Sequence, residues 1–409
     1  MLPRVIFHID VNSAFLSWSA VKGVMEGRAD IRLVPSVVSG DPSDRRSIIT
    51  AASLPAKRLG IKTAQPVSMA LRICPSLVIV PGDWIWYRQC SRSFIAICRE
   101  FSPVLEQFSI DECFIDMTFR LAGRDPVTVA AALKDRIRTE LGFTVNVGVG
   151  SNKLLAKMAS DFEKPDKVHT LWLEEVPQKM WPLGVRDLLW VGKKTEARLV
   201  ANGIRTIGEL ARLGPNSLAQ LVGRKFSAQL HDNANGIDDS PVETEVPEAK
   251  SYSAERTFSK DLTDPRDIDR ALFNVACTVA HRIRRDRFRA GCVSMFVKRT
   301  DFSVAQKQCS LETPTDVTAV ILNEARRMLT EVWDGSAPLR QVGLGVSRLT
   351  HDLFVQGSLF EDPKLEYYRA WDRDYDDRRR RKEDARLLAF ERKQEKEKAE
   401  GPTGEGLKG

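Results

Sequence analysis

Short apolar runs, rich in β-branched and aromatic residues, recur along the first half of the chain and predict buried strands. Three of them adjoin carboxylates: Val5–Ile9 precedes Asp10, and Val104–Ile110 and Cys113–Met117 flank Asp111 and Glu112. This pattern places the three acids at strand ends or in a tight hairpin turn. An ordinary polar turn is the alternative interpretation of the adjacent Asp111 and Glu112.

Carboxylates held on rigid strands suggest a metal site. Their hard oxygen atoms suit Mg²⁺, an ion that keeps several waters and is usually shared with substrate phosphates. We therefore predict phosphoryl transfer as the chemistry of Asp10, Asp111 and Glu112.

The segments around these acids have a mixed pattern. Residues 12–77, which five prolines interrupt, are predicted to be mostly helical. After a helix near Val127–Leu141 and a β run, Asn152 can cap a helix that carries Lys153 and Lys157. Lysines four residues apart share a helix face, so one of them could neutralise a triphosphate; both could instead be exposed helix lysines.

The middle of the chain resembles a helix-hairpin-helix. An apolar helix through Trp190 is predicted to lead into a turn and a second helix over residues 195–202, and the turn holds Gly192, Lys193 and Lys194. In such a motif, backbone N–H groups and lysines of the turn bind a DNA phosphate without reading bases. Any helix pair joined by a Gly-Lys turn is the alternative.

Beyond a linker at residues 236–250, rich in Asp, Pro and Glu, the pattern predicts a compact βαββαβ domain. Its expected elements are a strand at Ser251–Phe258, a helix at Arg266–Arg287, strands at Cys292–Arg299 and Ser303–Leu311, a helix at Asp316–Val332 and a strand at Gln341–Arg348. The middle hairpin, with Lys298 and Arg299, alternates charged and apolar residues. One sheet face could therefore lie against a nucleic-acid backbone.

Charge adds to this picture through its distribution. The net charge is +7 over 409 residues, yet residues 361–409 contain fourteen basic and fourteen acidic residues, so all the excess lies upstream. Residues 250–350 hold seventeen basic against twelve acidic residues, with a dense arginine cluster that includes Arg285 and Arg287. A phosphate backbone is the natural partner, and a solvated, arginine-rich helix face is the alternative.

Length and composition bound the class of protein. A chain of 409 residues indicates two to four domains. No signal peptide pattern and no apolar stretch of membrane-spanning length is present, so we expect a cytoplasmic protein without a membrane partner. The seven cysteines are scattered without CxxC pairs and the five histidines do not cluster with them, which argues against zinc and against a disulfide framework.

Four segments carry a more specific signal: Asp10-Val-Asn-Ser-Ala-Phe15, Ser109-Ile-Asp111-Glu112, Val147-Gly-Val-Gly-Ser-Asn152-Lys153-Leu-Leu-Ala-Lys157-Met-Ala-Ser-Asp161 and Lys164-Pro-Asp166. Together they resemble the Y-family of translesion DNA polymerases, most nearly the bacterial polymerase IV type. The resemblance extends over roughly residues 3–360 and implies an α+β multidomain chain with the right-hand architecture of a polymerase. The implied parts are a palm with a mixed sheet at 1–11 and 78–165, small fingers at 12–77, a helical thumb with the helix-hairpin-helix at 166–235, the linker at 236–250, a βαββαβ little finger at 251–350 and a tail at 351–409.

The resemblance also implies an activity. A protein of this family extends a primer on a DNA template with dNTPs by two-metal phosphoryl transfer, at low fidelity, in translesion synthesis and DNA damage tolerance. By this resemblance Asp10, Asp111 and Glu112 hold two Mg²⁺ ions, and the backbone carbonyl of Val11 adds a ligand. Lys157 contacts the incoming triphosphate.

Phe15 resembles the family's steric gate, since an aromatic ring against the 2′ position of the sugar leaves no room for a hydroxyl group. A core phenylalanine at a strand-to-helix junction is the alternative. Several positions depart from the polymerase IV pattern. Asn12 stands where a second aspartate is usual, and Ala51, Leu54 and Lys57 stand where Thr, Tyr and Arg are more frequent. Lys57 retains a charge for the nucleotide but lacks a bidentate fork, so we expect active but weak synthesis.

The peptide Gln356-Gly-Ser-Leu359-Phe360 resembles the motif by which such polymerases bind the bacterial sliding clamp, with Gln356, Leu359 and Phe360 as anchors. An ordinary linker is the alternative. The expected partners are primer–template DNA, a dNTP and this clamp, with the polymerase itself a monomer. A charged helix followed by disorder is expected in the tail, without an assigned function. Two other functions stay open: an inactive DNA-binding accessory factor docked on the clamp, and a palm enzyme such as a nucleotidyl cyclase.

Overall fold

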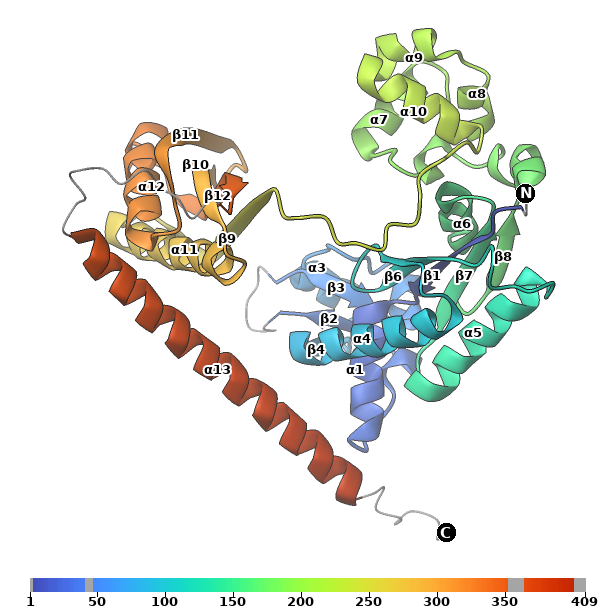
Figure 1. Cartoon of the computed structure of the whole chain (residues 1–409), viewed down its shortest axis with the longest axis horizontal. Coiled ribbons are helices and arrows are strands. Elements are labelled where there is room, and N and C mark those ends of the chain that lie inside the picture. Colours follow the sequence, from blue (N-terminus) through green and yellow to red (C-terminus); the bar gives the residue numbers. More distant parts are fainter. Residues whose placement is uncertain (1–2, 41–46, 352–363, 401–409) are drawn as a thin grey trace. The chain divides into compact units, whose positions relative to one another are not determined.

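The structure is a computed structural model that describes residues 3–40, 47–351 and 364–400. It divides into two compact units, unit 1 at residues 1–246 and unit 2 at residues 247–409 (Figure 1). The boundary between the units lies within the stretch that the sequence analysis assigns to a linker. No helix in the described ranges is long and apolar enough to cross a membrane.

A five-stranded mixed sheet with strand order β5-β6-β1-β7-β8 forms the centre of unit 1. Its strands are β1 (Ile6–Val11), β5 (Leu105–Gln107), β6 (Glu112–Asp116), β7 (Val145–Gly150) and β8 (Val168–Leu171). Strand β1 pairs antiparallel with β6 and β7, whereas β7 and β8 are parallel. The hairpin expected around Asp111 and Glu112 is confirmed, because β5 and β6 pair antiparallel.

Three helices pack against this sheet: α4 (Trp84–Phe101), α5 (Pro126–Leu141) and α6 (Lys153–Ser160). Asn152 caps α6 as expected, since its side chain accepts a hydrogen bond from the backbone N–H of Leu155. The backbone of α6 approaches β7 closely at Gly148, where a Cβ atom would lie 1.9 Å from the carbonyl oxygen of Ala156. Glycine at this position therefore lets α6 lie directly on the strand.

A smaller sheet of order β3-β2-β4 lies between the first strand and the hairpin in sequence. It consists of β2 (Ser36–Ser39), β3 (Ile49–Ala52) and β4 (Val78–Pro81), with helices α1 (Ala14–Met25), α2 (Leu54–Arg58) and α3 (Val67–Ile73) and the 3₁₀ helix η1 (Ile31–Leu33). The prediction that residues 12–77 are mostly helical is therefore wrong. Four-residue strands such as β2 carry too little periodic signal alone, and they form because β2 pairs with both β3 and β4.

The helical end of unit 1 has its own apolar core, which continues onto Leu154 and Leu155 of α6. Its elements are η2 (Leu173–Glu175), η3 (Val176–Met180), η4 (Val185–Asp187), α7 (Lys193–Ala201), α8 (Ile207–Ala211), α9 (Pro215–Val222) and α10 (Arg224–Ala234). A capping box formed by Thr206 and Glu209 starts α8. The prediction of an apolar helix through Trp190 is wrong, because this stretch contains only the short η4 and turns. Leu188 is buried there, but Trp190 is exposed.

Unit 2 contains the expected βαββαβ arrangement, in a four-stranded antiparallel sheet of order β11-β10-β12-β9. Its elements are β9 (Ser251–Leu262), α11 (Pro265–Arg285), β10 (Arg289–Arg299), β11 (Val304–Thr315), α12 (Thr318–Val332) and β12 (Leu339–Thr350). Helices α11 and α12 bury one face of the sheet in a core that includes Val293, Met295 and Val297 of β10 (Figure 1). The alternating residues of β10, among them Phe296 and Lys298, lie on the other face.

A long helix, α13 (Lys364–Glu400), follows in unit 2. Its first turns pack on α11 and α12 through Trp371, whose ring centroid is 5.8 Å from that of Phe273, and through two acids. Asp372 is 2% exposed and accepts hydrogen bonds from the N–H and hydroxyl of Thr318, while Asp376 accepts from Arg284 and pairs with His281. The tail helix is thus part of the folded unit.

Candidate active site

The three predicted acids come together on one edge of the mixed sheet. Asp10 and Glu112 are direct cross-strand partners in the β1–β6 ladder. Asp111 immediately precedes β6, and its carbonyl oxygen accepts a hydrogen bond from the backbone N–H of Val11 at 3.0 Å. Strand pairing therefore fixes all three backbone positions, although Asp10 is about a hundred residues away from Asp111 and Glu112 in sequence.

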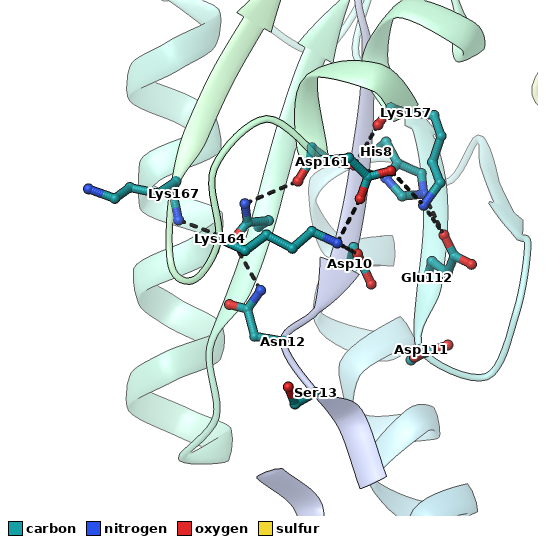
Figure 2. Close-up of polar contacts among 12 residues, drawn as sticks. His8, Asp10, Asn12, Ser13, Asp111, Glu112, Lys157, Asp161, Lys164 and Lys167 are labelled. Atoms are coloured by element: carbon teal, nitrogen blue, oxygen red, sulfur yellow. Dashed lines mark hydrogen bonds and ion pairs between the residues drawn. The ribbon is translucent and has the colours of Figure 1, made fainter. Parts of the chain in front are cut away.

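Glu112 lies in a network that the sequence analysis found only in part (Figure 2). Its Oε2 atom is 2.6 Å from Nζ of Lys157 and 3.1 Å from Nε2 of His8. Burial favours a raised pKa for Glu112, but the hydrogen bonds from His8 and Lys157 outweigh it and lower the pKa to about 2. Glu112 is therefore a carboxylate at neutral pH.

His8 connects this carboxylate to helix α6. It is completely buried, and its Nδ1 atom lies 2.8 Å from the hydroxyl of Ser160, the last residue of the helix. Burial lowers the pKa of His8, so the ring is neutral near pH 7 and donates through Nε2 to Glu112. The sequence analysis missed His8, because a histidine within an apolar strand has the pattern of a core residue.

Asp10 and Asp111 have different surroundings (Figure 2). Asp10 forms an ion pair with Lys164, which also contacts Asp161 at 2.7 Å. Asp111 accepts a hydrogen bond from the hydroxyl of Ser109 at 2.6 Å. Burial raises the pKa of Asp111, and the negative charges of Asp10 and Glu112 raise it further against the opposing Ser109 bond. The site thus concentrates negative charge around Asp111.

No three acidic, histidine or cysteine side chains in the described ranges are arranged to share a metal ion. The reason is local, because the carboxylate of Asp10 points to Lys164 and that of Glu112 points to Lys157. Lys164 belongs to the segment Lys164-Pro-Asp166 that resembles the Y-family. Its contact with Asp10 spans 154 positions, so the spacing of residues could not predict it.

A cavity of about 370 Å³ adjoins the acids. Asp10, Val11 and Asp111 line it on one side, and Ala51, Leu54 and Lys57 line it from the smaller sheet and α2. The ammonium group of Lys57 donates to the hydroxyl of Ser13 at 2.8 Å. Burial lowers the pKa of Lys57, and the nearby positive charge of Lys164 lowers it further. The cavity therefore has carboxylates at one side and a cation at the other.

Phe15 also lines this cavity and is supported by other aromatic rings. Its ring stacks on that of Tyr87, with centroids 5.0 Å apart and planes at 25°, and meets Trp84 edge-on at 5.2 Å. Tyr87 is itself buried, and its hydroxyl is 2.6 Å from that of Ser19. Phe15 is thus held on the cavity wall.

Two other residues of the sequence analysis form contacts within the fold: Asn12, at the cavity wall, and Lys153, which does not line the cavity. The amide of Asn12 donates to Asn146 and accepts from the N–H of Asp166, so it fastens the end of β1 to neighbouring segments. Lys153 pairs with Glu106 at 2.7 Å and donates to the carbonyl of Pro241. Of the two lysines on α6, only Lys157 reaches the acids.

The candidate DNA-binding residues lie at the start of α7, at and just after the end of α11, and at the end of β10. Gly192 caps α7, and Lys193 and Lys194 occupy its first turn with exposed side chains. In unit 2, Arg287 is exposed, and Arg285 is exposed and paired with Asp286.

The two candidate DNA-binding residues of β10, Lys298 and Arg299, have different surroundings. Lys298 lies on the sheet face opposite the helices. Arg299 instead donates to the carbonyl of Val332 at the end of α12, at 3.4 Å. The clamp-peptide residues Gln356, Leu359 and Phe360 lie outside the described residues.

Comparison with known proteins agrees with these observations. The impB/mucB/samB family matches residues 9–161, the C-terminal domain of the same family matches 249–359, and a DNA polymerase-iota thumb domain matches 186–238. The chain is 40% identical to DNA polymerase IV of Clostridium acetobutylicum, over 88% of this chain and 91% of that protein. It is 34% identical to DNA polymerase IV 1 of Bacillus subtilis, over 83% of this chain and 81% of the relative.

Among solved structures, the Y-family DNA polymerase chimera Dbh-Dpo4(243-245)-Dbh superposes with a TM-score of 0.73 at 20% identity. The match covers 85% of this chain and all of the chimera, and it shows that the two share a fold. The right-hand α+β architecture expected from the sequence is thereby confirmed. By its matches over most of its length, the chain belongs to the impB/mucB/samB family and is a Y-family DNA polymerase.

Proposed function

We propose that this polymerase extends a DNA primer by two-metal phosphoryl transfer at the edge of the mixed sheet. The observation that carries the proposal is the gathering of Asp10, Asp111 and Glu112 at adjacent positions of β1 and the β5–β6 hairpin. Carboxylates in such proximity repel one another, and after burial this repulsion from Asp10 and Glu112 is a further cause of the raised pKa of Asp111. A divalent cation would remove that repulsion.

The donor set fits two Mg²⁺ ions. Three carboxylates, with the backbone carbonyl of Val11, are the hard oxygen ligands that Mg²⁺ takes, and the adjacent cavity can admit the substrate phosphates. Binding the ions requires the carboxylates of Asp10 and Glu112 to turn away from Lys164 and Lys157. When bound, the ions would act as Lewis acids on the triphosphate and on the primer 3′-hydroxyl.

Two lysines would bind the substrate at the same site. Lys157, on α6 beside Glu112, would bind the triphosphate of the incoming dNTP, and Lys57 would bind it from the opposite wall of the cavity. Ala51 and Leu54 offer no hydroxyl group there, so we expect weak nucleotide binding. Phe15, backed by Tyr87, would exclude a 2′-hydroxyl group and so select dNTPs over NTPs.

DNA would be bound along the chain's basic turns. The start of α7, with Gly192, Lys193 and Lys194, offers backbone N–H groups and ammonium groups to a phosphate. Arg285, Arg287 and Lys298 of unit 2 would add phosphate contacts, whereas Arg299 would contribute less because it bonds within its own domain. In this proposal residues 1–11 and 78–165 act as palm, 12–77 as fingers, 166–235 as thumb and 251–350 as little finger.

Clamp binding through Gln356, Leu359 and Phe360 would hold a monomeric polymerase at the replication fork in the cytoplasm, where low-fidelity synthesis past template lesions is required. Deleting residues 356–360 should abolish stimulation by the bacterial sliding clamp and leave basal extension unchanged. Stimulation that survives the deletion would reject this part of the proposal.

Primer extension with single dNTPs or NTPs and Mg²⁺ tests the central proposal. Wild-type protein should add dNTPs on a template, Asp111→Ala should lose the reaction, and Phe15→Ala should gain use of NTPs. Absence of Mg²⁺-dependent product from the wild-type protein would favour an accessory DNA-binding role. Product formed without primer would indicate a nucleotidyl cyclase.

A further inference from the structure

Trp190 has a backbone conformation that large residues rarely adopt. Its φ angle is +74°, in the left-handed region that glycine occupies without cost. The residue is 57% exposed although tryptophan has a large apolar side chain. Unusual backbone of this kind tends to occur at functional sites, where the surrounding structure holds it.

The turn that carries Trp190 is held on both sides. Arg186 donates to the carbonyl of Val191 at 2.8 Å, directly after Trp190. Leu188 and Val191 are buried in the helical core of unit 1, so the exposed ring projects from an anchored turn. Trp190 is therefore exposed because its buried neighbours fix the turn. An apolar core is present beside it.

Phe108 is a second exposed aromatic residue at the same place. It lies between β5 and β6, three residues before Asp111, and is 41% exposed. Its ring meets that of Trp190 edge-on, with centroids 6.5 Å apart, and meets the buried Phe114 edge-on at 5.5 Å. The hairpin with the acidic residues thus shares an aromatic surface with the turn before α7.

The aromatic pair has cationic neighbours. Gly192, Lys193 and Lys194 follow Trp190 within four positions, and both lysines are exposed. An exposed aromatic pair beside lysines and the N–H groups of a helix start combines the two kinds of contact that single nucleic-acid strands require, a phosphate contact and a stacking contact. Proteins and membranes offer no comparable alternation of anionic and planar groups.

We propose that Trp190 and Phe108 form a stacking contact for a nucleobase or deoxyribose of the DNA strand whose phosphates bind at the turn of α7. Phe108 lies in the same hairpin connection as Asp111, where the proposed reaction extends the primer, so we assign this strand as the primer, close to its extended end. This inference rests on the proposed DNA site at Gly192, Lys193 and Lys194. It adds an aromatic contact to a set of otherwise electrostatic ones, and Trp190 acts in binding rather than in the chemical step.

Trp190→Gly separates a binding role from a structural one. Glycine relieves the left-handed backbone, so the melting temperature should stay equal or rise, while the loss of the indole should weaken primer–template binding about tenfold. Binding is measured by fluorescence anisotropy without nucleotide, so it does not depend on the proposed catalytic roles. Phe119→Ala is the matched control, because Phe119 is 82% exposed on another loop and should leave affinity unchanged.

A 2-aminopurine in the primer strand gives a direct reading of stacking. Wild-type protein should quench the probe at one position near the 3′ end, and Trp190→Gly should restore its fluorescence at that position alone. Unchanged affinity and quenching in Trp190→Gly, with a lower melting temperature, would overturn the proposal and leave the Trp190–Phe108 contact as a purely structural bridge. Loss of primer extension in wild-type protein with DNA binding intact would instead count against the proposed catalytic site.

Discussion

The acidic edge of the mixed sheet and the start of the tail helix both bury carboxylates, but their surroundings differ. Burial raises the pKa of Asp111 and of Asp372. Around Asp111 the neighbouring charges are the carboxylates of Asp10 and Glu112, which raise its pKa further. Around Asp372 the hydrogen bond from Thr318 and the charge of Arg284 oppose the effect of burial.

The difference separates a functional charge cluster from a structural one. Arg284 binds both Asp372 and Asp376, so the tail network is matched within the chain. Within the described part of the chain, Asp111 forms no ion pair with a lysine or arginine, whereas its two acidic neighbours pair with Lys157 and Lys164. Unmatched carboxylates attract an external cation, whereas matched ones only stabilise the packing.

Asp111→Asn should cause the largest loss of primer extension. An isosteric amide removes a metal ligand, and we expect primer extension to fall at least about a thousandfold. Because the change also removes repulsion from Asp10 and Glu112, the melting temperature should stay equal or rise. Steady-state single-nucleotide extension and calorimetry measure the two effects. A variant that is much less stable would show that Asp111 has a structural role like that of Asp372.

Asp372→Asn should have the reverse effect, a loss of stability without a loss of primer extension. It leaves Arg284 with one buried partner fewer, and the free energy of unfolding of unit 2 should fall by about 3 kcal/mol. Urea unfolding followed by the fluorescence of Trp371 measures this loss. Single-nucleotide extension on saturating DNA should be unchanged, and a strong loss of extension would contradict the separation of the two networks.

Lys157→Met tests the cation that faces the acids. Removal of the ammonium group should raise the KM for dNTP about tenfold, because the triphosphate loses a charge-assisted hydrogen bond. Lys153→Met is the matched control on the same helix, since Lys153 binds Glu106 away from the cavity. Equal KM values for the two variants would remove Lys157 from the nucleotide site.

The pH dependence of the tail network should be the smallest effect. Burial acts to raise the pKa of Asp376, but Arg284 and His281 outweigh it and lower the pKa below the usual 3.8. Its stabilising contribution is therefore present above pH 3.8 and is lost as the pH falls through the lowered value. Asp376→Asn should remove this part of the acid sensitivity of unit 2, and an unchanged acid profile would show that Asp376 contributes nothing.

Much of the candidate site could be predicted from the sequence. Asp10 follows the apolar run Val5–Ile9 and Glu112 precedes the apolar run Cys113–Met117, and such runs favour strands through local preference and burial. The turn at Gly192, the capping box at Thr206 and the βαββαβ order are local signals of the same kind. The small sheet of residues 36–81 was missed, because strands of four residues depend on partners that the local sequence does not identify.

The sequence by itself determined the acids, their order along the strands and the family of the chain, since each rests on short motifs with local geometry. Only the tertiary structure decided which cations meet them. The pairing of Asp10 with Lys164, the burial of His8 against Glu112 and the docking of Asp372 on Arg284 join positions far apart in sequence. The left-handed turn at Trp190 is of the same kind, because its neighbours in the folded core impose it. Such contacts depend on how the elements pack, and packing distances are not encoded in residue spacing.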